Sequence, residues 1–339
     1  EVDITSFVVS GKNELVIFLD DYERDENGDS LHGTGNWLTN QLRGIQRDVW
    51  LLEKGDVYID DLTIVTSVRE KTLSLKYVIK NTTDCALNLI IKPAIDGNPV
   101  EIPEINGMIS AQSEATAELS VPWENPKLWD TFTPNLYYIR TAVLSDGAEI
   151  DHMTERFGFR ELWIEGENLL LNGHPLHLFS DFGHKVTPYS YTRGWIEKWF
   201  GMLRDYNMNH SRLHTHPHPE LILDMADEAG IYITSETNMH GSGSGQAAAD
   251  IRYWQNGQEH VRNLVKREKN HPCVILYSCG NELRWNCREN ELMKKEAPKI
   301  RALFNELDPT RIAYHEGDSS LWDESTQEML SRHYGKDAS

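Results

Sequence analysis

One run of residues, 270–282, constrains the fold of this chain more than any other part of the sequence. It opens with Asn-His-Pro, which ends any preceding helix, because proline cannot continue a helix and biases the residue before it toward extended geometry. Residues 273–277 are then apolar or aromatic without polar alternation, as is typical of a parallel strand buried on both faces. Asn281 and Glu282 follow at once. The run therefore predicts an amide and a carboxylic acid at the carboxyl end of a buried strand, where barrel enzymes carry their catalytic groups.

Helix and strand patterns alternate around this run. After a hairpin and strand at 169–179, we expect helices at 193–206, 220–229, 259–269 and 289–307 and strands at 209–213, 231–235 and 308–315. Gly230 stands in the C-cap position of the second helix. This order predicts that residues 157–339 form the first part of a (β/α)8 TIM barrel. Because such a barrel closes on eight strands, we expect about three βα units to be absent, so that the chain is a fragment or omits part of a longer polypeptide.

Residues 56–156 show a different pattern of short strands between turn signals. Strands are expected at 58–67, 72–80, 86–92, 114–121 and 136–144. About 100 residues with turns at this spacing predict an immunoglobulin-like β-sandwich. We expect the tryptophans at 123 and 129 to pack in its core or at its edges.

Residues 1–55 contain expected strands at 14–19 and around 44–51, separated by an acidic, glycine-containing loop. The N-terminus has neither a basic segment nor an apolar one, so we expect any signal peptide to have been removed or never to have existed.

Charge and composition exclude some classes of partner. A formal net charge of -20 argues against nucleic-acid binding, which needs a basic face, and no apolar run approaches the roughly 20 residues that span a bilayer. The four cysteines, at 85, 273, 279 and 287, fit neither a zinc site nor a dense disulfide framework, and we expect buried free thiols. The compartment (periplasmic, secreted or cytoplasmic) and homo-oligomerisation stay open.

Glu282 is the first candidate for chemistry. A glutamate beside a semi-buried wall can hold a proton at neutral pH and release it to a leaving oxygen, while Asn281 can donate to a sugar hydroxyl. The alternative is that Asn281 and Glu282 only cap the following helix.

The full run 270–282 resembles the acid/base signature of glycoside hydrolase family 2, the β-galactosidase, β-glucuronidase and β-mannosidase family. Tyr277 and Cys273 depart from its usual pattern, which has tryptophan and serine there. Residues 44–51 resemble the end of the family's N-terminal jelly-roll domain, and 122–129 and 134–137 resemble its linker before the barrel. The resemblance covers most of residues 44–318 and implies that residues 1–55 are the C-terminal part of a jelly roll of about eight strands.

A second match lies at 209–217 and 227–233. In the family an arginine at this strand end supports the catalytic carboxylates, and a histidine shortly after it faces the sugar. Arg212 matches the arginine, and either His214 or His216 could match the histidine. A zinc site on the alternating histidines is the competing interpretation, with Glu236 or His240 as further ligands.

The resemblance also bears on cofactors and on the second carboxylate. Glu236 ends the third strand and, like His240, is expected to contact substrate; Met239 stands where some relatives place a magnesium ligand, so we predict no required metal, with magnesium the alternative. The family is retaining and therefore needs a nucleophilic carboxylate about 5 to 5.5 Å from the acid/base. The resemblance puts that nucleophile beyond residue 339, and it assigns Glu316 to support of the pocket.

Together these features predict an exo-acting retaining β-glycosidase that removes terminal sugars from oligo- or polysaccharides, with Glu282 as proton donor and then base. The alternative is an inactive carbohydrate-binding or structural relative that lacks the nucleophile. The sequence does not identify the sugar.

Overall fold

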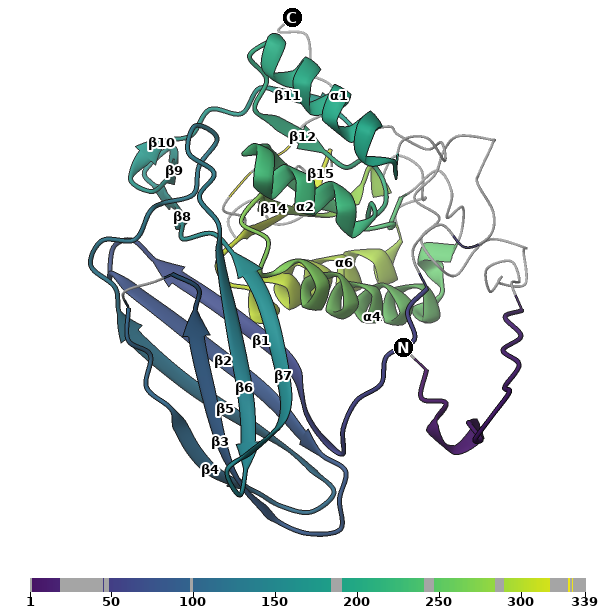
Figure 1. Ribbon diagram of the computed structural model, residues 1–339. Coiled ribbons are helices and arrows are strands. Elements are labelled where there is room, and N and C mark those ends of the chain that lie inside the picture. The colour runs from purple at the N-terminus through teal and green to yellow at the C-terminus, as the bar shows by residue number, and fades with distance from the viewer. Residues whose placement is uncertain are drawn as a thin grey trace, which may run out of the picture.

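The computed structural model describes residues 2–18, 45, 49–97, 100–183, 191–240, 247–283, 290–317, 329 and 331. A β-sandwich, blue to teal in Figure 1, lies against a layer of parallel strands and helices in green and yellow. The predicted sandwich-then-barrel order is confirmed.

The sandwich consists of antiparallel strands in two sheets, ordered β1-β2-β5 and β4-β3-β6-β7. Their bounds are β1 Val57–Ser67, β2 Thr72–Asn81, β3 Leu87–Ile95, β4 Ile105–Ile109, β5 Ser113–Pro122, β6 Tyr137–Ser145 and β7 Ala148–Phe157. Alternate residues of β2 are buried, as the period of two requires for a strand with one face on a core. Sequence patterning predicted all of these strands except β4 and β7. The pattern does not identify β4 and β7 because few of their side chains are buried, so apolar and polar residues do not alternate clearly in them.

The second layer is a parallel sheet ordered β11-β12-β13-β14-β15 within the described residues. Its strands are β11 Ser180–Phe182, β12 His210–Arg212, β13 Tyr232–Glu236, β14 Val274–Asn281 and β15 Ile312–Glu316. Helices α1 Arg193–Asp205, α2 Glu220–Ala229, α4 Ile251–Glu268 and α6 Glu291–Leu307 alternate with them, and a small sheet of β8 Leu162–Glu165, β9 Asn168–Leu171 and β10 His174–Pro175 precedes them. This is the partial TIM barrel that the sequence predicts.

Helices α2 and α4 differ in how closely their bounds follow the sequence pattern. Gly230 ends α2 in the left-handed conformation, with φ 68°, as predicted for a C-cap. Helix α4 begins eight residues earlier than predicted, because Asp250 caps it by accepting from the amide of Arg252 at 2.8 Å. Its first turns also bury Tyr253 and Trp254. Polar residues follow these two in the sequence and obscure the apolar pattern of the helix.

The N-terminal residues differ from expectation. The described residues from 2 to 18 contain a short 3-10 turn, Thr5–Phe7, and no strand, so the strand expected at 14–19 is not found in its described part. Leu15, Val16 and Phe18 are exposed there, and none of the strands in the part of the chain that the structure describes pairs with this apolar run. The described residues of the expected strand at 44–51 are likewise neither paired nor buried.

The cysteines are partly as predicted. Cys273 and Cys279 are free and buried, but Cys85 is free and exposed, because it lies in the turn between β2 and β3. Cys287 lies outside the described residues. The helices that the structure describes include none that is both long and apolar enough to cross a bilayer.

Side chains of the sandwich bond directly to the barrel layer. Asn270, just before β14, accepts from the amide of Ile64 at 3.0 Å and donates to the carbonyl of Leu62 at 2.8 Å. Trp129 is fully buried among barrel residues rather than sandwich ones, and its indole N–H donates to the carbonyl of Asp227 in α2 at 2.9 Å. The sandwich therefore packs against the amino-terminal edge of the parallel sheet, where its strands begin. The carboxyl-terminal edge, where the strands end, holds the candidate site.

Candidate active site

Four polar side chains come together because each is the last residue of its strand. They are Arg212 of β12, Glu236 of β13, Asn281 of β14 and Glu316 of β15. These strands are parallel neighbours, so their carboxyl ends meet at one edge of the sheet. Residues up to 104 positions apart in the sequence are thereby placed within one hydrogen-bond network.

Arg212 is the centre of this network. Its Nε donates to Oε2 of Glu236 at 2.9 Å, and its Nη2 donates to the side-chain oxygen of Asn281 at 2.5 Å. Its Nη1 lies 3.6 Å from Oε1 of Glu316. The guanidinium is thus the common partner of two carboxylates and an amide, which fixes the orientation of all three.

Glu236 is fully buried and receives a second hydrogen bond, from Oγ of Ser278 at 2.6 Å. Burial raises the pKa of Glu236 and outweighs the opposing effect of the Arg212 charge. Burial alone would lower the pKa of Arg212, but the charges of Glu236 and Glu316 outweigh burial and raise it. Arg212 therefore remains a cation and supplies the positive charge of the site.

Glu316 is held on two sides. Besides Arg212, its Oε1 accepts from Oγ of Ser331 at 2.5 Å. Burial, followed by the Glu316 charge, raises the pKa of the neighbouring phenol Tyr314 well above its ordinary value. A carboxylate engaged in this way suits the predicted support of the pocket better than attack on a substrate.

Glu282 follows β14 directly and is half-buried. Its backbone has φ 49°, a left-handed conformation that non-glycine residues rarely adopt, and its amide donates to the carbonyl of Glu316 at 3.0 Å. Gly280 has φ 157°, and a Cβ there would lie 2.7 Å from the carbonyl oxygen of Met239. The backbone of residues 280–282 thus contacts Met239, which follows β13, and Glu316 of β15, at the edge where Arg212 lies.

The candidate histidines fall into two groups. His240 is buried and bridges to Asn281 through the backbone, and the ring of His214 lies 6.1 Å from that of His240 between centroids. His216 instead stacks on His218 with centroids 4.6 Å apart. Of the two alternatives left open by the sequence, His214 is the one whose ring lies beside that of His240.

Metal ligation was the competing interpretation for these histidines. Within the described residues, the three potential ligands whose atoms lie within 4.8 Å of one another are Asp227, His271 and Cys273, at the other end of β14. Asp227 there is already bonded to His271 at 2.6 Å and to Arg156 at 3.0 Å. Met239, which stands where some relatives place a magnesium ligand, is buried, and its thioether packs toward Gly257 of α4.

Three members of the arrangement were missed by sequence reasoning. Ser278 and Ser331 donate to the two carboxylates, and the ring of Phe182, the last residue of β11, lies 5.7 Å from the guanidinium carbon of Arg212. Phe182 lies three residues beyond the strand expected at 169–179, because β11 occupies Ser180–Phe182, so the strand end was placed too early to identify it. Ser331 carried no usable signal, since its contact depends on how the chain returns after β15.

Comparison with known proteins agrees with this geometry. Residues 159–338 match the profile of the TIM barrel domain of glycosyl hydrolases family 2, and residues 57–160 match a second profile of glycosyl hydrolases family 2. The two matches meet where the sandwich ends and the barrel layer begins.

Individual relatives are more distant and longer. A β-galactosidase of Clostridium acetobutylicum is 27% identical over 368 residues, covering 100% of this chain but 38% of the relative. A putative β-glucuronidase of Formosa agariphila is also 27% identical, covering 93% of this chain and 39% of its own length. The chain thus spans less than half the length of these relatives.

Solved structures share the fold. A family 2 β-galacturonidase from Eisenbergiella tayi, bound to galacturonate, superposes with a TM-score of 0.69 at 22% identity, over 77% of this chain and 47% of that one. A Bacteroides uniformis β-glucuronidase gives a TM-score of 0.67 at 22% identity, over 78% of this chain and 35% of that one.

Proposed function

The chain belongs to glycosyl hydrolases family 2, and from this premise we propose that it carries the acid/base half of a retaining, exo-acting β-glycosidase. The observation that carries the proposal is the convergence of Arg212, Glu236, Asn281 and Glu316 at the strand edge from which Glu282 emerges. Glu282 protonates the glycosidic oxygen as the bond breaks and then deprotonates the water that releases the sugar.

The other residues have positioning roles in this proposal. Arg212 orients Asn281, whose amide nitrogen is left to donate to a sugar hydroxyl because its oxygen accepts from Arg212. Glu236 and Glu316 hold Arg212, and His214 and His240 form the adjoining wall. His216, stacked on His218, is proposed as a more distant part of the substrate-binding surface.

A retaining mechanism needs a second carboxylate about 5 to 5.5 Å from Glu282 as nucleophile. Because Glu236 and Glu316 are both engaged by Arg212, neither is assigned this role, and a nucleophile beyond residue 339 stays a prediction. The same observation favours the alternative function, a carbohydrate-binding relative without turnover. The two are separated by assaying hydrolysis and sugar binding on a polypeptide that contains this chain and the remainder of a family 2 barrel.

The names of the relatives suggest a class of substrate for this chain. Their names include a β-galactosidase, a putative β-glucuronidase and a β-galacturonidase, so we propose a terminal β-linked hexose or hexuronic acid. Because the Arg212 guanidinium is bonded to protein carboxylates, it is not assigned to a uronate. A panel of aryl β-glycosides identifies the sugar, and unchanged rates after EDTA treatment are expected if no metal is required.

The test introduces Glu282→Gln into that longer polypeptide and uses two aryl β-glycosides that differ only in leaving group. A poor leaving group needs the proton, so kcat/KM should fall by about 10² to 10⁴-fold, whereas an activated dinitrophenolate should leave at a much less reduced rate in the glycosylation step. Glu149→Gln, an exposed residue of the sandwich, is the matched control and should not change either rate. Equal losses on both substrates, or no loss, would contradict the assigned role of Glu282.

A further inference from the structure

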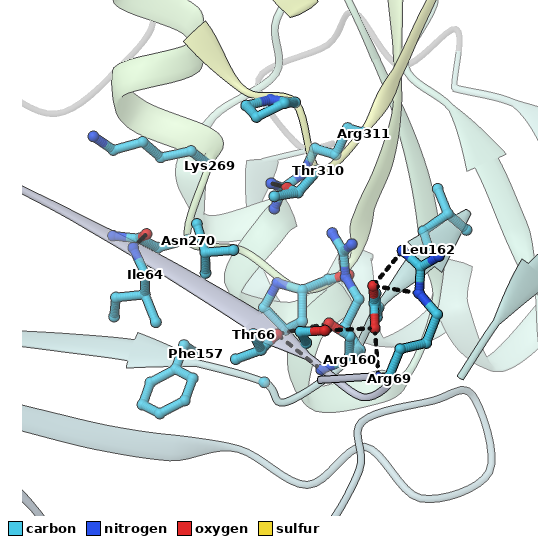
Figure 2. Close-up of a pocket in the computed structure, with 16 residues that line it drawn as sticks. Ile64, Thr66, Arg69, Phe157, Arg160, Leu162, Lys269, Asn270, Thr310 and Arg311 are labelled. Atoms are coloured by element: carbon cyan, nitrogen blue, oxygen red, sulfur yellow. Dashed lines mark hydrogen bonds and ion pairs between the residues drawn. The ribbon is translucent and has the colours of Figure 1, made fainter. Parts of the chain in front are cut away.

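A cavity of about 160 Å³ lies between the sandwich and the amino-terminal edge of the parallel sheet, away from the candidate active site (Figure 2). Its walls come from β1, from residues 157–162, and from the segments that lead into β14 and β15. Its charged lining residues are the four cations Arg69, Arg160, Lys269 and Arg311 and one carboxylate, Glu161. The excess of cations is local, since the whole chain has a formal net charge of -20.

Three of these cations already have carboxylate partners. Arg69 pairs with Glu161 at 2.6 Å, and Arg311 pairs with Asp308 at 2.6 Å. Lys269 pairs with Asp61, and in Figure 2 its side chain extends away from the other labelled residues. These three charges are therefore largely compensated without any ligand.

Arg160 differs from the other three. It is 5% exposed, and its Nε and Nη2 donate to the main-chain carbonyls of Pro272 at 3.1 Å and Val274 at 2.7 Å. Across the described residues it has no carboxylate in hydrogen-bond or ion-pair contact, and its Nη1 donates no hydrogen bond. A buried guanidinium therefore borders the cavity without a carboxylate in direct contact, although the charge of Asp308 acts on it from farther away, and its Nη1 amino group is unused.

Arg311 uses the same main-chain acceptor as Arg160. Nε of Arg311 donates to the same carbonyl oxygen of Val274, also at 2.7 Å, so two guanidinium groups share one neutral acceptor. Burial, followed by the charge of Arg311, lowers the pKa of Arg160 to about 9. Asp308 opposes this shift only in part, and an anion placed between the cavity wall and Arg160 would further reduce the free-energy cost of the buried charge.

We propose that this cavity binds a small oxyanion of the phosphate or sulfate class, held by the Nη1 edge of Arg160. Oxyanions match the guanidinium because they accept charge-assisted hydrogen bonds, and a cavity of about 150 Å³ admits a ligand as large as benzene. The bound anion contacts both layers of the molecule, because β1 lines one wall and the segments before β14 and β15 line the others. Its binding should therefore stabilise the junction between sandwich and barrel.

The experiment measures thermal unfolding of the chain in inorganic phosphate, and separately in sulfate, at constant ionic strength set with sodium chloride. A saturable rise in Tm on the order of 5 °C is expected, with one binding site per chain in calorimetric titration. Arg160→Met should abolish the rise, whatever its own starting Tm. Arg140→Met, which removes an exposed arginine of β6 paired with Glu149, is the charge-matched control and should keep it.

A second variant covers the case in which Arg160→Met fails to fold. Val65 is half-buried and lines the cavity from β1, so Val65→Glu would introduce a carboxylate beside Arg160. This variant should lose the response to phosphate while retaining a cooperative unfolding transition. No saturable binding to the unmodified chain, or an equal response in Arg160→Met or Val65→Glu, would overturn the proposal.

Discussion

Both edges of the parallel sheet hold buried arginines, but the two edges differ in what these arginines contact. At the carboxyl-terminal edge, Arg212 contacts side chains: two carboxylates and the oxygen of Asn281. At the amino-terminal edge, Arg160 and Arg311 donate mainly to the main-chain carbonyls where β14 begins. One edge therefore uses its arginine to orient side chains, and the other uses its arginines to hold backbone.

This difference matches what each edge has to do. At the carboxyl-terminal edge, side chains that converge on a cation can be oriented toward a substrate. At the amino-terminal edge, the arginines bind main-chain carbonyls and so leave no side chain oriented for a substrate. The contacts from arginine to main-chain carbonyls join the sandwich to the barrel, because Arg160 comes from the segment after the sandwich and its partners belong to the barrel. The comparison predicts different consequences for substitutions at the two edges.

The largest effect is expected for Arg212→Met at the carboxyl-terminal edge. Removal of this cation leaves the buried carboxylate of Glu236 uncompensated, which should lower the free energy of unfolding by about 3 to 5 kcal/mol. Urea denaturation measures the change, with the exposed Arg140→Met expected to lose less than about 1 kcal/mol. If the two variants lose the same amount, Arg212 is not the electrostatic centre of the edge.

A smaller effect is expected for Gly158→Ala at the junction. A Cβ at this position would lie 2.7 Å from Cβ of Trp129 and 2.8 Å from Cβ of Pro272, so sandwich and barrel must separate slightly to admit it. Overpacking of this kind costs about 1 to 3 kcal/mol. Gly107→Ala in β4 is the control, because nothing lies within 4 Å of the added atom. Similar unfolding curves for the two variants would mean that the junction is loosely packed.

The smallest effect concerns pH and the pair of His271 with Asp227. Burial alone would lower the pKa of His271, but the carboxylate of Asp227, 2.6 Å away, outweighs burial and raises this pKa. The other charged groups that face the pair are Asp224, Glu268 and Arg156. A raised pKa in the folded state means that the stabilisation is complete below the unfolded value of about 6.5. It is then lost as pH rises through the folded pKa.

His271→Gln removes this titration. The difference in free energy of unfolding between the unmodified chain and the variant should be constant below about pH 6.5 and should shrink above it, by at most about 1.4 kcal/mol per pH unit. Urea denaturation from pH 5 to 9 measures the slope. A difference that grows with pH would show that His271 is neutral in the folded chain.

Sequence patterning predicted much of the barrel layer because its signals are local. Residues 220–229 were expected as a helix closed by Gly230, and α2 has these bounds and a left-handed glycine at its end. The apolar run before Asn281 predicted β14, which is buried along its whole length. Predictions failed where local patterns lack a partner or a buried face, as at residues 14–18 and in β7.

The residues that end the strands were also evident from the sequence, but their contacts were not. Asn281 followed from the end of an apolar run, and Arg212, Glu236 and Glu316 were named in advance through the resemblance to the family at the expected strand ends. Their convergence on one guanidinium depends on strand order and register, which bring together residues 24 and 69 positions apart. The position of the His214 ring beside His240, and the lack of a direct carboxylate contact to Arg160 among the described residues, likewise depend on the tertiary structure. Local patterning reports the conformation and burial of each segment, whereas charge compensation depends on neighbours that only the folded chain supplies.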